Sequence, residues 1–385
     1  MLKIEQYNSI FSIYVYLMLV LPVVILALCE KKSKILNMCI SAVMIILLFG
    51  IDSLQMWEFL AFLVLVLGII FSFYFFRKHS SSEMMYFMLM LLAIMPLAIV
   101  KIEGKSEYAS YLGFAGMSYI SFKVWELLIQ IHDGKIETLK LQDVVGFLIF
   151  APSFSSGPIG RYQSFLEESE KKVCREEYIE KYLLPGIKKI ALGMTYKFAL
   201  AFMISEYVMA RYEHLSVKGA IAYMYAYTLY LFFDFAGYSL MAVGTGYLMG
   251  IRLPDNFNKP FLARNMKEFW ERWHISLSTW FNDFVFSRFV LNNTRNGLFK
   301  SPKKAARWAY LVTMLVMGFW HGLYFHYILY GLYQGVLLVL TDIWVKSKTY
   351  RKVKKMKYYN GVSRVICFHM IAFGMLIFSG FVIEN

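Results

Sequence analysis

His321 is the residue whose type and position point most directly to chemistry. It follows the apolar run 308–320 and precedes the run 323–345, and the basic segments 292–307 and 346–357 flank this pair. Segments rich in Lys and Arg lie on the cytoplasmic side of a membrane, so the chain must enter and return between them. The outward run has only 13 residues, about 20 Å as a helix, which is less than the ~30 Å hydrocarbon core.

We therefore expect His321 to lie deep in the outer half of the membrane. An ionisable side chain at such a depth marks a functional site by default. A neutral, buried imidazole there can serve as a general base. The alternative is a packed histidine whose ring bonds to one backbone carbonyl.

Two further polar residues are candidates for the same site. His274 stands beside charged residues that look cytoplasmic, so it is either a substrate contact near the inner mouth or a capped residue on the surface of a helix. Asp234 stands in the middle of the apolar run 219–249. A carboxylate in apolar surroundings needs a partner. Asp234 would either orient a histidine or pair with an arginine, and structural support is the favoured interpretation.

The elements that position these residues must be membrane helices. Of the 385 residues, 59% are apolar, 18% aromatic and only 17% charged, whereas a soluble domain has about 25% charged residues. The formal net charge of +14 suits cytoplasmic loops and the inner face of a membrane. Apolar runs occur at 9–29, 35–51, 54–76, 84–100, 186–210, 219–249, 308–320, 323–345 and 362–383. We expect an all-α, multi-pass protein of the cell membrane, with about 9–11 spans in a single integral domain over residues 1–385.

Two stretches depart from simple spans. Residues 150–161 hold two prolines and two glycines, and backbone freed from a helix has no partner in hydrocarbon. The segment is interpreted as a re-entrant loop that lines a cavity, with an ordinary interfacial loop as the alternative. Residues 261–290 interleave charges with aromatic residues. That pattern is typical of a helix at or dipping from the membrane interface, whether it is functional or a plain surface helix.

Other chemistries have no signature in the sequence. P-loop, HExxH and GxSxG motifs are absent, and Gly244-Thr245-Gly246 falls inside a span rather than between a strand and a helix. The four cysteines are scattered and form no CxxC pair. We therefore expect no directly bound metal or nucleotide cofactor and no nucleic-acid partner.

Five motifs resemble those of the membrane-bound O-acyltransferase (MBOAT) family. They are Gly116–Lys123, Phe154–Gly160, Phe233–Ser239, Phe269–His274 and Phe319–Gly322. Their order and spacing fit the family across a core of roughly residues 100–345, and five co-linear motifs are more specific than any one alone. Within the family, the run Trp273–Phe289, the tail Phe378–Phe381 and the short length are most similar to members that transfer D-alanine in the D-alanylation of Gram-positive teichoic acids.

The resemblance implies a fold and a reaction. Spans with re-entrant and interfacial helices would surround a central tunnel. The donor would be D-alanine held as a thioester on the phosphopantetheine arm of a small acidic carrier protein in the cytoplasm, and a basic inner face suits such a partner. The family's nearly invariant histidine falls on His321, which would act as general base toward an acceptor hydroxyl. Other membrane proteins of D-alanylation would supply this hydroxyl, with (lipo)teichoic acid as the final destination.

The resemblance also assigns residues to the path of the substrate. The family's second characteristic polar position falls on His274. Many relatives carry Asn there, which argues against a need for both imidazoles in proton transfer. The substrate and tunnel contacts would be His274, Asp234, Trp320, Ser155, Pro158 and Trp273.

Three other functions compete with this one. Relatives that resemble alginate O-acetylases acetylate an exported polysaccharide, although they tend to be longer. A transporter or flippase would move an activated amino acid without chemistry, and replacement of His321 would then spare function. A membrane scaffold would leave His321, Asp234 and the broken loop at 152–160 without purpose.

Overall fold

The computed structural model describes residues 4–80, 82–103, 113–212 and 216–382. Within these ranges the regular structure is helical, and β-type pairing is limited to an isolated bridge between Phe257 and Trp273. The chain divides into two compact units, Met1–Met194 with Tyr238–Pro254 and Thr195–Gly237 with Asp255–Asn385. We call these the first and the second unit and describe each by itself. The all-α prediction is confirmed, and the single integral domain stays a prediction.

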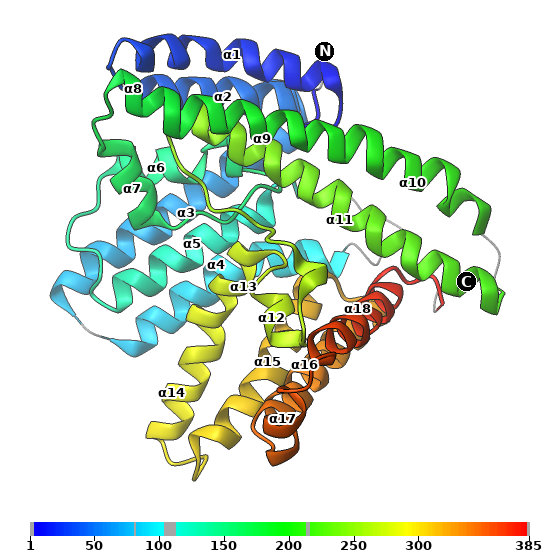
Figure 1. Cartoon of the computed structure of the whole chain (residues 1–385). Helices are drawn as coiled ribbons and strands as arrows, with labels where there is room; N and C mark the ends of the chain where they lie inside the picture. The colour runs from blue at the N-terminus through cyan, green and yellow to red at the C-terminus, as the bar shows by residue number, and fades with distance from the viewer. Residues whose placement is uncertain (1–3, 81, 104–112, 213–215, 383–385) are drawn as a thin grey trace. The chain divides into compact units, whose positions relative to one another are not determined.

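The first unit is built from the helices of the N-terminal half (Figure 1). In it α1 contacts both α2 and α8, and α3 contacts α4 and α5. A π-helical turn, Ile179–Leu183, joins α8 to α9, and a 3-10 turn covers Ala151–Ser153. The helices are α1 (Ile10–Leu28), α2 (Lys34–Phe49), α3 (Leu54–His79), α4 (Glu83–Glu103), α5 (Met117–His132), α6 (Leu141–Leu148), α7 (Tyr162–Glu170), α8 (Arg175–Tyr178) and α9 (Leu184–Met194).

The second unit holds most of the C-terminal half. A π-helical turn, Thr195–Ala201, leads into its first helix, and a second one, Asn282–Phe286, joins α13 to α14. Short 3-10 turns cover Met209–Tyr212 and Pro260–Leu262. The helices are α10 (Phe202–Tyr207), α11 (Val217–Leu248, whose last residues belong to the first unit), α12 (Met266–Trp270), α13 (Ile275–Phe281), α14 (Ser287–Arg295), α15 (Pro302–His321), α16 (Phe325–Val345), α17 (Lys348–Val353) and α18 (Tyr359–Phe378).

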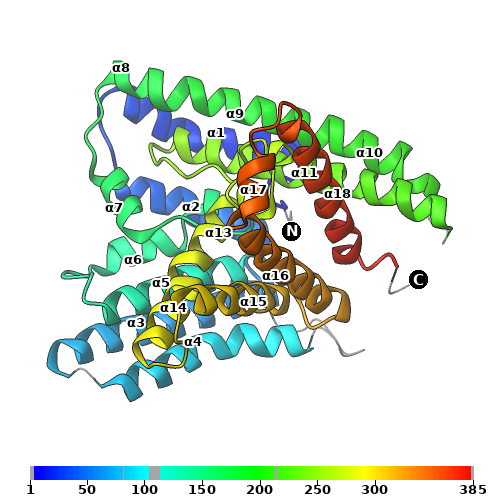
Figure 2. The ribbon, with the colours of Figure 1, turned by 60° about the horizontal axis from the view of Figure 1, so that its bottom comes forward.

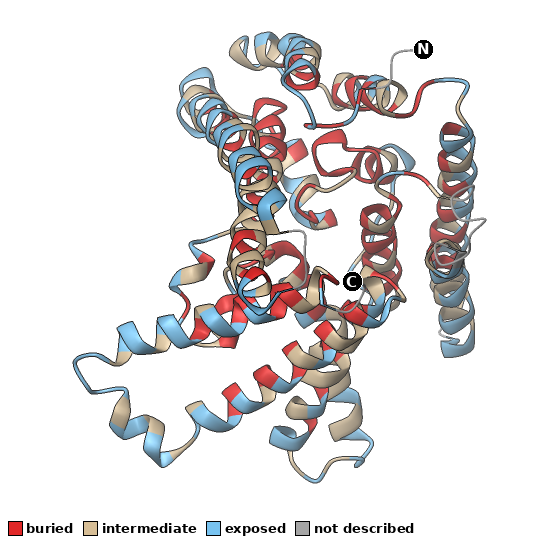
Figure 3. Cartoon of the chain, turned by 90° about the vertical axis from the view of Figure 1, so that its right-hand side faces the viewer, coloured by how far each residue is buried: buried red, intermediate tan, exposed pale blue. Residues whose placement is uncertain are grey.

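Several helices are suited to a lipid environment. Among the described residues six helices are long and apolar enough to cross a membrane, namely α1, α3, α4, α11, α16 and α18, and α2 is a shorter apolar helix. Large apolar side chains lie on their outer faces, such as Val64, Met84 and Phe87, each more than 60% exposed. Figure 3 shows helices that are buried along one side and exposed along the other. Water would not tolerate so much exposed apolar surface, so the chain is a multi-pass membrane protein.

The Pro- and Gly-rich segment is irregular and buried, as its composition predicts. After the 3-10 turn Ala151–Ser153, the backbone forms no helix until Tyr162, yet Phe154 and the residues from Gly157 to Gly160 are buried in the first unit. A Cβ on Gly157 would lie 2.3 Å from the carbonyl oxygen of Pro152. Only glycine fits this close approach of backbone to backbone. Such backbone is tolerated at membrane depth where protein surrounds it.

Candidate functional site

His321 is the last residue of α15, and the pairing of α15 with α16 holds it in place (Figure 2). The two helices approach closely because glycine stands at their contact. A Cβ on Gly318 would lie 2.6 Å from the carbonyl oxygen of Tyr327. Any larger residue at this position would push the helices apart. The close packing therefore fixes the end of α15, and with it the imidazole, against α16.

Helix α15 begins earlier than the apolar pattern predicts. It starts at Pro302 and has 20 residues, about 30 Å, rather than the 13 of the run 308–320. Proline is favoured in the first turn of a helix, and Lys and Arg are good helix formers. The basic segment thus extends the helix instead of preceding it. The added turns are basic, so α15 is not among the six helices that are long and apolar enough to cross a membrane, and the depth of His321 stays a prediction.

Aromatic rings surround His321 without burying it completely. Its ring centroid lies 4.5 Å from that of Trp320 and 4.9 Å from that of Phe378. The rings of Tyr327 and Tyr330 follow at 5.8 and 6.4 Å. The side chain keeps intermediate exposure. An imidazole in this setting can accept a proton from an incoming group, while the flat rings restrict how that group approaches.

His274 lies where the backbone interrupts a helix. It separates α12 from α13 and has φ 45° and ψ 54°, a left-handed conformation that is uncommon outside glycine. Asn256 holds this break: its carbonyl accepts from the Ile275 amide at 3.0 Å, and its Oδ1 accepts from the Ser276 hydroxyl at 2.6 Å. The predicted interfacial helix over 261–290 is therefore wrong as one continuous element, because contacts with residues 256–258 replace its helical hydrogen bonds.

Burial and charge keep His274 neutral. The residue is 5% exposed, and its ring meets the ring of Phe235 edge to face at a centroid distance of 4.7 Å. Burial lowers the pKa of His274 to about 3, and repulsion from a protonated His321 would lower it as the second cause. The two imidazoles of the second unit thus lie within electrostatic range of each other. The alternative of a surface cap is wrong, because the side chain is buried.

One ring nitrogen of His274, Nδ1, is available to bind a ligand. Its Nδ1 is buried and has no hydrogen-bond partner on any other residue that the structure describes. A buried polar atom without a partner is rare in folded proteins. Trp273, the residue before it, packs against the rings of Phe257 at 5.0 Å and Phe269 at 5.5 Å. Trp273 thus packs within an aromatic cluster beside the helix interruption at His274 and is buried.

Asp234 has a cationic partner that sequence reasoning missed. Lys197 Nζ, in the π-helical turn Thr195–Ala201, donates to Asp234 Oδ1. The expected ion pair therefore exists with a lysine instead of an arginine. π-helical turns inside longer helices occur often at functional sites. Lys197 carries the same signal as Asp234, a charge within an apolar run, so the sequence could have revealed it.

A cavity of about 370 Å³ lies in the second unit among α12, α13, α15 and α16. Ile275, next to His274, and Met317, one helical turn before His321, both line it. The hydroxyl of Thr313 also lies in this lining, buried and without a hydrogen-bond partner among the described residues. The lining combines apolar side chains with a few polar and charged ones, among them Lys267 and Glu271, which suits a slender, partly polar ligand.

Ser155 and Pro158 belong to the first unit. The Ser155 hydroxyl donates to Oε1 of Gln6 at 2.6 Å and lies 2.5 Å from the hydroxyl of Tyr238. The amide of Gln6 in turn donates to the carbonyl of Ala151 at 2.6 Å. Pro158 is buried in the irregular segment. Neither Gln6 nor Tyr238 could be found from the sequence, because each is far from Ser155 along the chain.

No group of three or more His, Cys, Asp and Glu side chains that could hold a metal ion occurs in the ranges described above. Trp320 and Trp273 each precede one of the two histidines, and His274 and His321 lie within electrostatic range of each other. Asp234 pairs with Lys197 instead of orienting either imidazole directly. The second unit thus brings together four of the seven residues predicted for the site, namely His321, His274, Trp320 and Trp273.

The chain is similar to known membrane acyltransferases along most of its length. The sequence model described as MBOAT, membrane-bound O-acyltransferase family, matches residues 43–382. A teichoic acid D-alanyltransferase of Bacillus subtilis (strain 168) is 36% identical over 97% of this chain and 98% of its own length. The protein of the same name from Streptococcus thermophilus is also 36% identical, over 98% of this chain and 95% of its own length.

A more distant relative has a different name. The probable alginate O-acetylase AlgI of Pseudomonas aeruginosa is 29% identical to this chain. The aligned region covers 68% of this chain and 48% of AlgI. The match of the family model alone spans well over half of the chain. This chain belongs to the membrane-bound O-acyltransferase family.

Proposed function

We propose that this protein transfers D-alanine in the D-alanylation of teichoic acid. The donor is the thioester of a phosphopantetheinyl carrier protein on the cytoplasmic side, and the first acceptor is a hydroxyl of a partner membrane protein. The two named D-alanyltransferases support this substrate because the match covers nearly the full length of all three chains. The observation that carries the mechanism is the half-exposed His321 at the end of α15, next to a buried, neutral His274.

His321 acts as the general base. It takes the proton of the acceptor hydroxyl while the hydroxyl oxygen attacks the carbonyl carbon of the thioester. The carbon–sulfur bond then breaks, the sulfur takes the proton from the imidazolium, and the D-alanyl ester remains on the acceptor. His274 contributes its unpaired Nδ1 as a contact for substrate and no proton, because its pKa of about 3 keeps the ring neutral near pH 7.

The cavity along α15 receives the phosphopantetheine arm. Its volume of about 370 Å³ suits a slender chain, and Thr313 offers a hydroxyl to an amide of the arm. The exposed Arg295, Lys300, Lys303 and Lys304 near the start of α15 supply positive charge for an acidic carrier. In this proposal a tunnel connects the cytoplasmic side, where the donor binds, with the side where the acceptor hydroxyl reaches His321.

A reconstituted transfer assay tests the proposal. Wild type, His321→Ala and the control His79→Ala are incubated with carrier protein bearing radiolabelled D-alanine and with membranes that supply acceptors. We expect wild type and His79→Ala to move label to acceptor, because His79 is an exposed residue at the end of α3. His321→Ala should bind carrier normally and transfer no label.

Two other outcomes would overturn parts of the proposal. Equal transfer by His321→Ala and wild type would contradict the general base and favour a transporter of activated amino acid. Consumption of an acetyl donor, with no reaction of the D-alanyl carrier, would keep the family and replace the substrate by that of an O-acetyltransferase. The match to AlgI makes this the second candidate, although it covers only 48% of that protein.

A further inference from the structure

A basic pocket in the first unit lies apart from the residues assigned to acyl transfer. Its volume is about 660 Å³, and it is formed by the last turn of α1, the loop before α2, the loop between α7 and α8, and residues 249–250. Five lysines line it against two glutamates. They are Lys31, Lys32, Lys34, Lys171 and Lys172. The pocket therefore concentrates positive charge on a concave surface.

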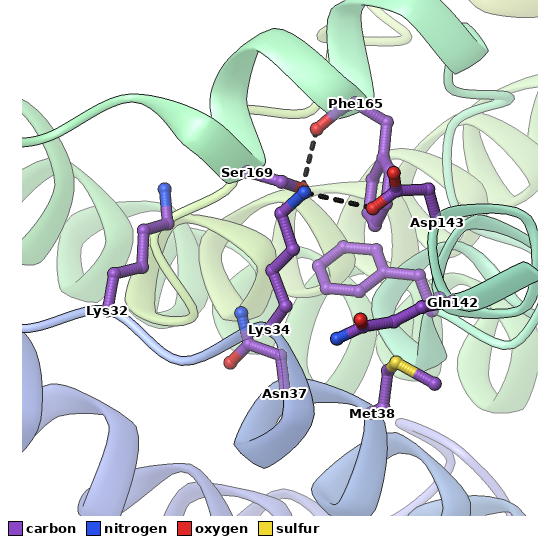
Figure 4. A pocket seen from close by; sticks show the side chains of 10 residues that line it. Lys32, Lys34, Asn37, Met38, Gln142, Asp143, Phe165 and Ser169 are labelled. Atoms are coloured by element: carbon purple, nitrogen blue, oxygen red, sulfur yellow. Dashed lines mark hydrogen bonds and ion pairs between the residues drawn. The ribbon is translucent and has the colours of Figure 1, made fainter. Parts of the chain in front are cut away.

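Some of this charge is already compensated. Lys34 Nζ pairs with Asp143 at 2.9 Å and Glu170 at 3.1 Å, and Lys171 pairs with Glu177 at 2.8 Å. Figure 4 shows Lys34 beside Lys32 where an adjoining hollow shares both side chains with the pocket. These pairs hold the loops in place without filling the pocket.

Three lysines retain charge for a ligand. Lys31 and Lys172 are exposed, and their amines take part in no ion pair or hydrogen bond in the described part of the chain. Lys32 Nζ donates only to neutral carbonyl oxygens, those of Gly250 at 2.8 Å and of Glu168. Burial lowers the pKa of Lys32 to about 8, and the nearby Lys171 and Lys34 lower it too, while Glu168 opposes them. An anion in the pocket would relieve this repulsion between lysines.

The opposite wall of the pocket is apolar. Val23, Leu26 and Ala27 of α1 form it, and α1 is long and apolar enough to cross a membrane. The pocket thus begins where a membrane helix ends and its basic loop starts. The loop 31–34 is lysine-rich, which places this end of α1 on the cytoplasmic side, where anionic lipids attract basic residues. A lipid meets both walls at once, with its headgroup among the lysines and its acyl chains along α1.

We propose that this pocket binds the phosphodiester headgroup of an anionic membrane phospholipid, with Lys31, Lys32 and Lys172 as its cationic contacts. A compact phosphate can contact these lysines without meeting Glu30 and Glu170, whereas a broad acidic protein surface would also meet the two carboxylates of the lining. The bound lipid joins α1, α2 and the loop between α7 and α8. This site is independent of the proposed acyl transfer.

Lipid retention by the full-length protein tests the proposal. Wild type, the double variant Lys31→Gln/Lys172→Gln and the control Lys352→Gln/Lys355→Gln are titrated with phosphatidylglycerol or phosphatidylcholine in detergent micelles. Bound lipid is counted by native mass spectrometry. The control removes the same charge from exposed lysines of the α17 region. We expect wild type and control to prefer phosphatidylglycerol and the pocket variant to bind it about tenfold more weakly, with an unchanged melting temperature in phosphatidylcholine nanodiscs.

Each other result overturns the proposal. Equal losses in the two double variants would mean unspecific attraction to the basic face, and equal retention of the two lipids would mean that no anion site exists. Protection from heat by soluble glycerol 3-phosphate, to the same degree as by phosphatidylglycerol, would mean that the pocket takes a free phosphate. Loss of carrier-protein binding with unchanged lipid binding would assign the lysines to a protein partner.

Discussion

The two histidines of the second unit differ in how the backbone holds them. His321 ends a regular helix of 20 residues and stays half-exposed among aromatic rings. His274 interrupts a helix in a left-handed conformation and is 5% exposed. The regular backbone therefore carries the imidazole that can exchange a proton, and the unusual backbone carries the one that stays neutral. An uncommon backbone conformation points to a functional position, and the burial of the side chain decides whether the imidazole can take up a proton.

The largest expected effect is on the rate of acyl transfer, and it distinguishes the imidazole that accepts a proton from the one that does not. A general base typically contributes about 10²–10⁴-fold to a rate, so His321→Ala should lower the single-turnover rate of acyl transfer by that factor. Added imidazole should restore part of this rate, because it can enter the space left by the half-exposed ring. The same addition should leave His274→Ala unchanged. Rescue of both variants, or of neither, would remove the distinction between them.

The second effect concerns the regular backbone that presents His321. Gly318→Ala places a Cβ 2.6 Å from the carbonyl oxygen of Tyr327, and overpacking of this kind costs about 1–3 kcal/mol. Gly361→Ala is the matched control, because a Cβ there meets no atom within 4 Å and alanine favours a helix. Thermal unfolding in nanodiscs should show a lower melting temperature for Gly318→Ala alone. A similar change in both variants would contradict the role of close α15–α16 packing.

The sequence predicts regular elements better than it predicts breaks. The apolar run 9–29 corresponds to α1, and the run 323–345 corresponds to α16, because a lipid-facing helix must be apolar along its length. Helix α15 begins at Pro302, six residues before the apolar run 308–320, because lysine and arginine favour helices although they are polar. Hydropathy reports the environment of a segment and not where its hydrogen-bonded helix begins.

The site depends on contacts that no local pattern contains. The sequence selects His321 and His274 as ionisable residues near apolar runs, and both belong to the second unit. The break at His274 depends on Asn256, and the position of Ser155 depends on Gln6 and Tyr238. These partners are distant along the chain, and the polar amides and hydroxyls involved look ordinary in the sequence. Only the folded backbone brings them together.

A third and smaller effect tests the unusual backbone at His274. Asparagine tolerates the left-handed conformation, whereas a β-branched residue does not. His274→Asn should therefore keep transfer within about tenfold of wild type, because asparagine also offers polar atoms and His274 supplies no proton. His274→Val should lower stability by roughly 1–2 kcal/mol more than His274→Asn. Melting temperatures and transfer rates of both variants measure this, and a His274→Asn enzyme as inactive as His321→Ala would contradict the proposed roles.

The last effect is a contribution of His274 to the pH dependence of stability. Its pKa in the folded protein, about 3, lies below the ordinary value of 6.5. Below pH 6.5 the unfolded chain therefore takes up a proton that the folded chain does not, so stability is lost as the pH falls, by roughly 1 kcal/mol per pH unit. His274→Asn removes this contribution. The melting temperature of wild type relative to His274→Asn should hence fall between pH 6.5 and pH 4.5 and stay level between pH 7 and pH 8. A difference that is constant over the whole range would mean that His274 has the same pKa in the folded and the unfolded chain. The contrast between the two histidines would then rest on geometry alone.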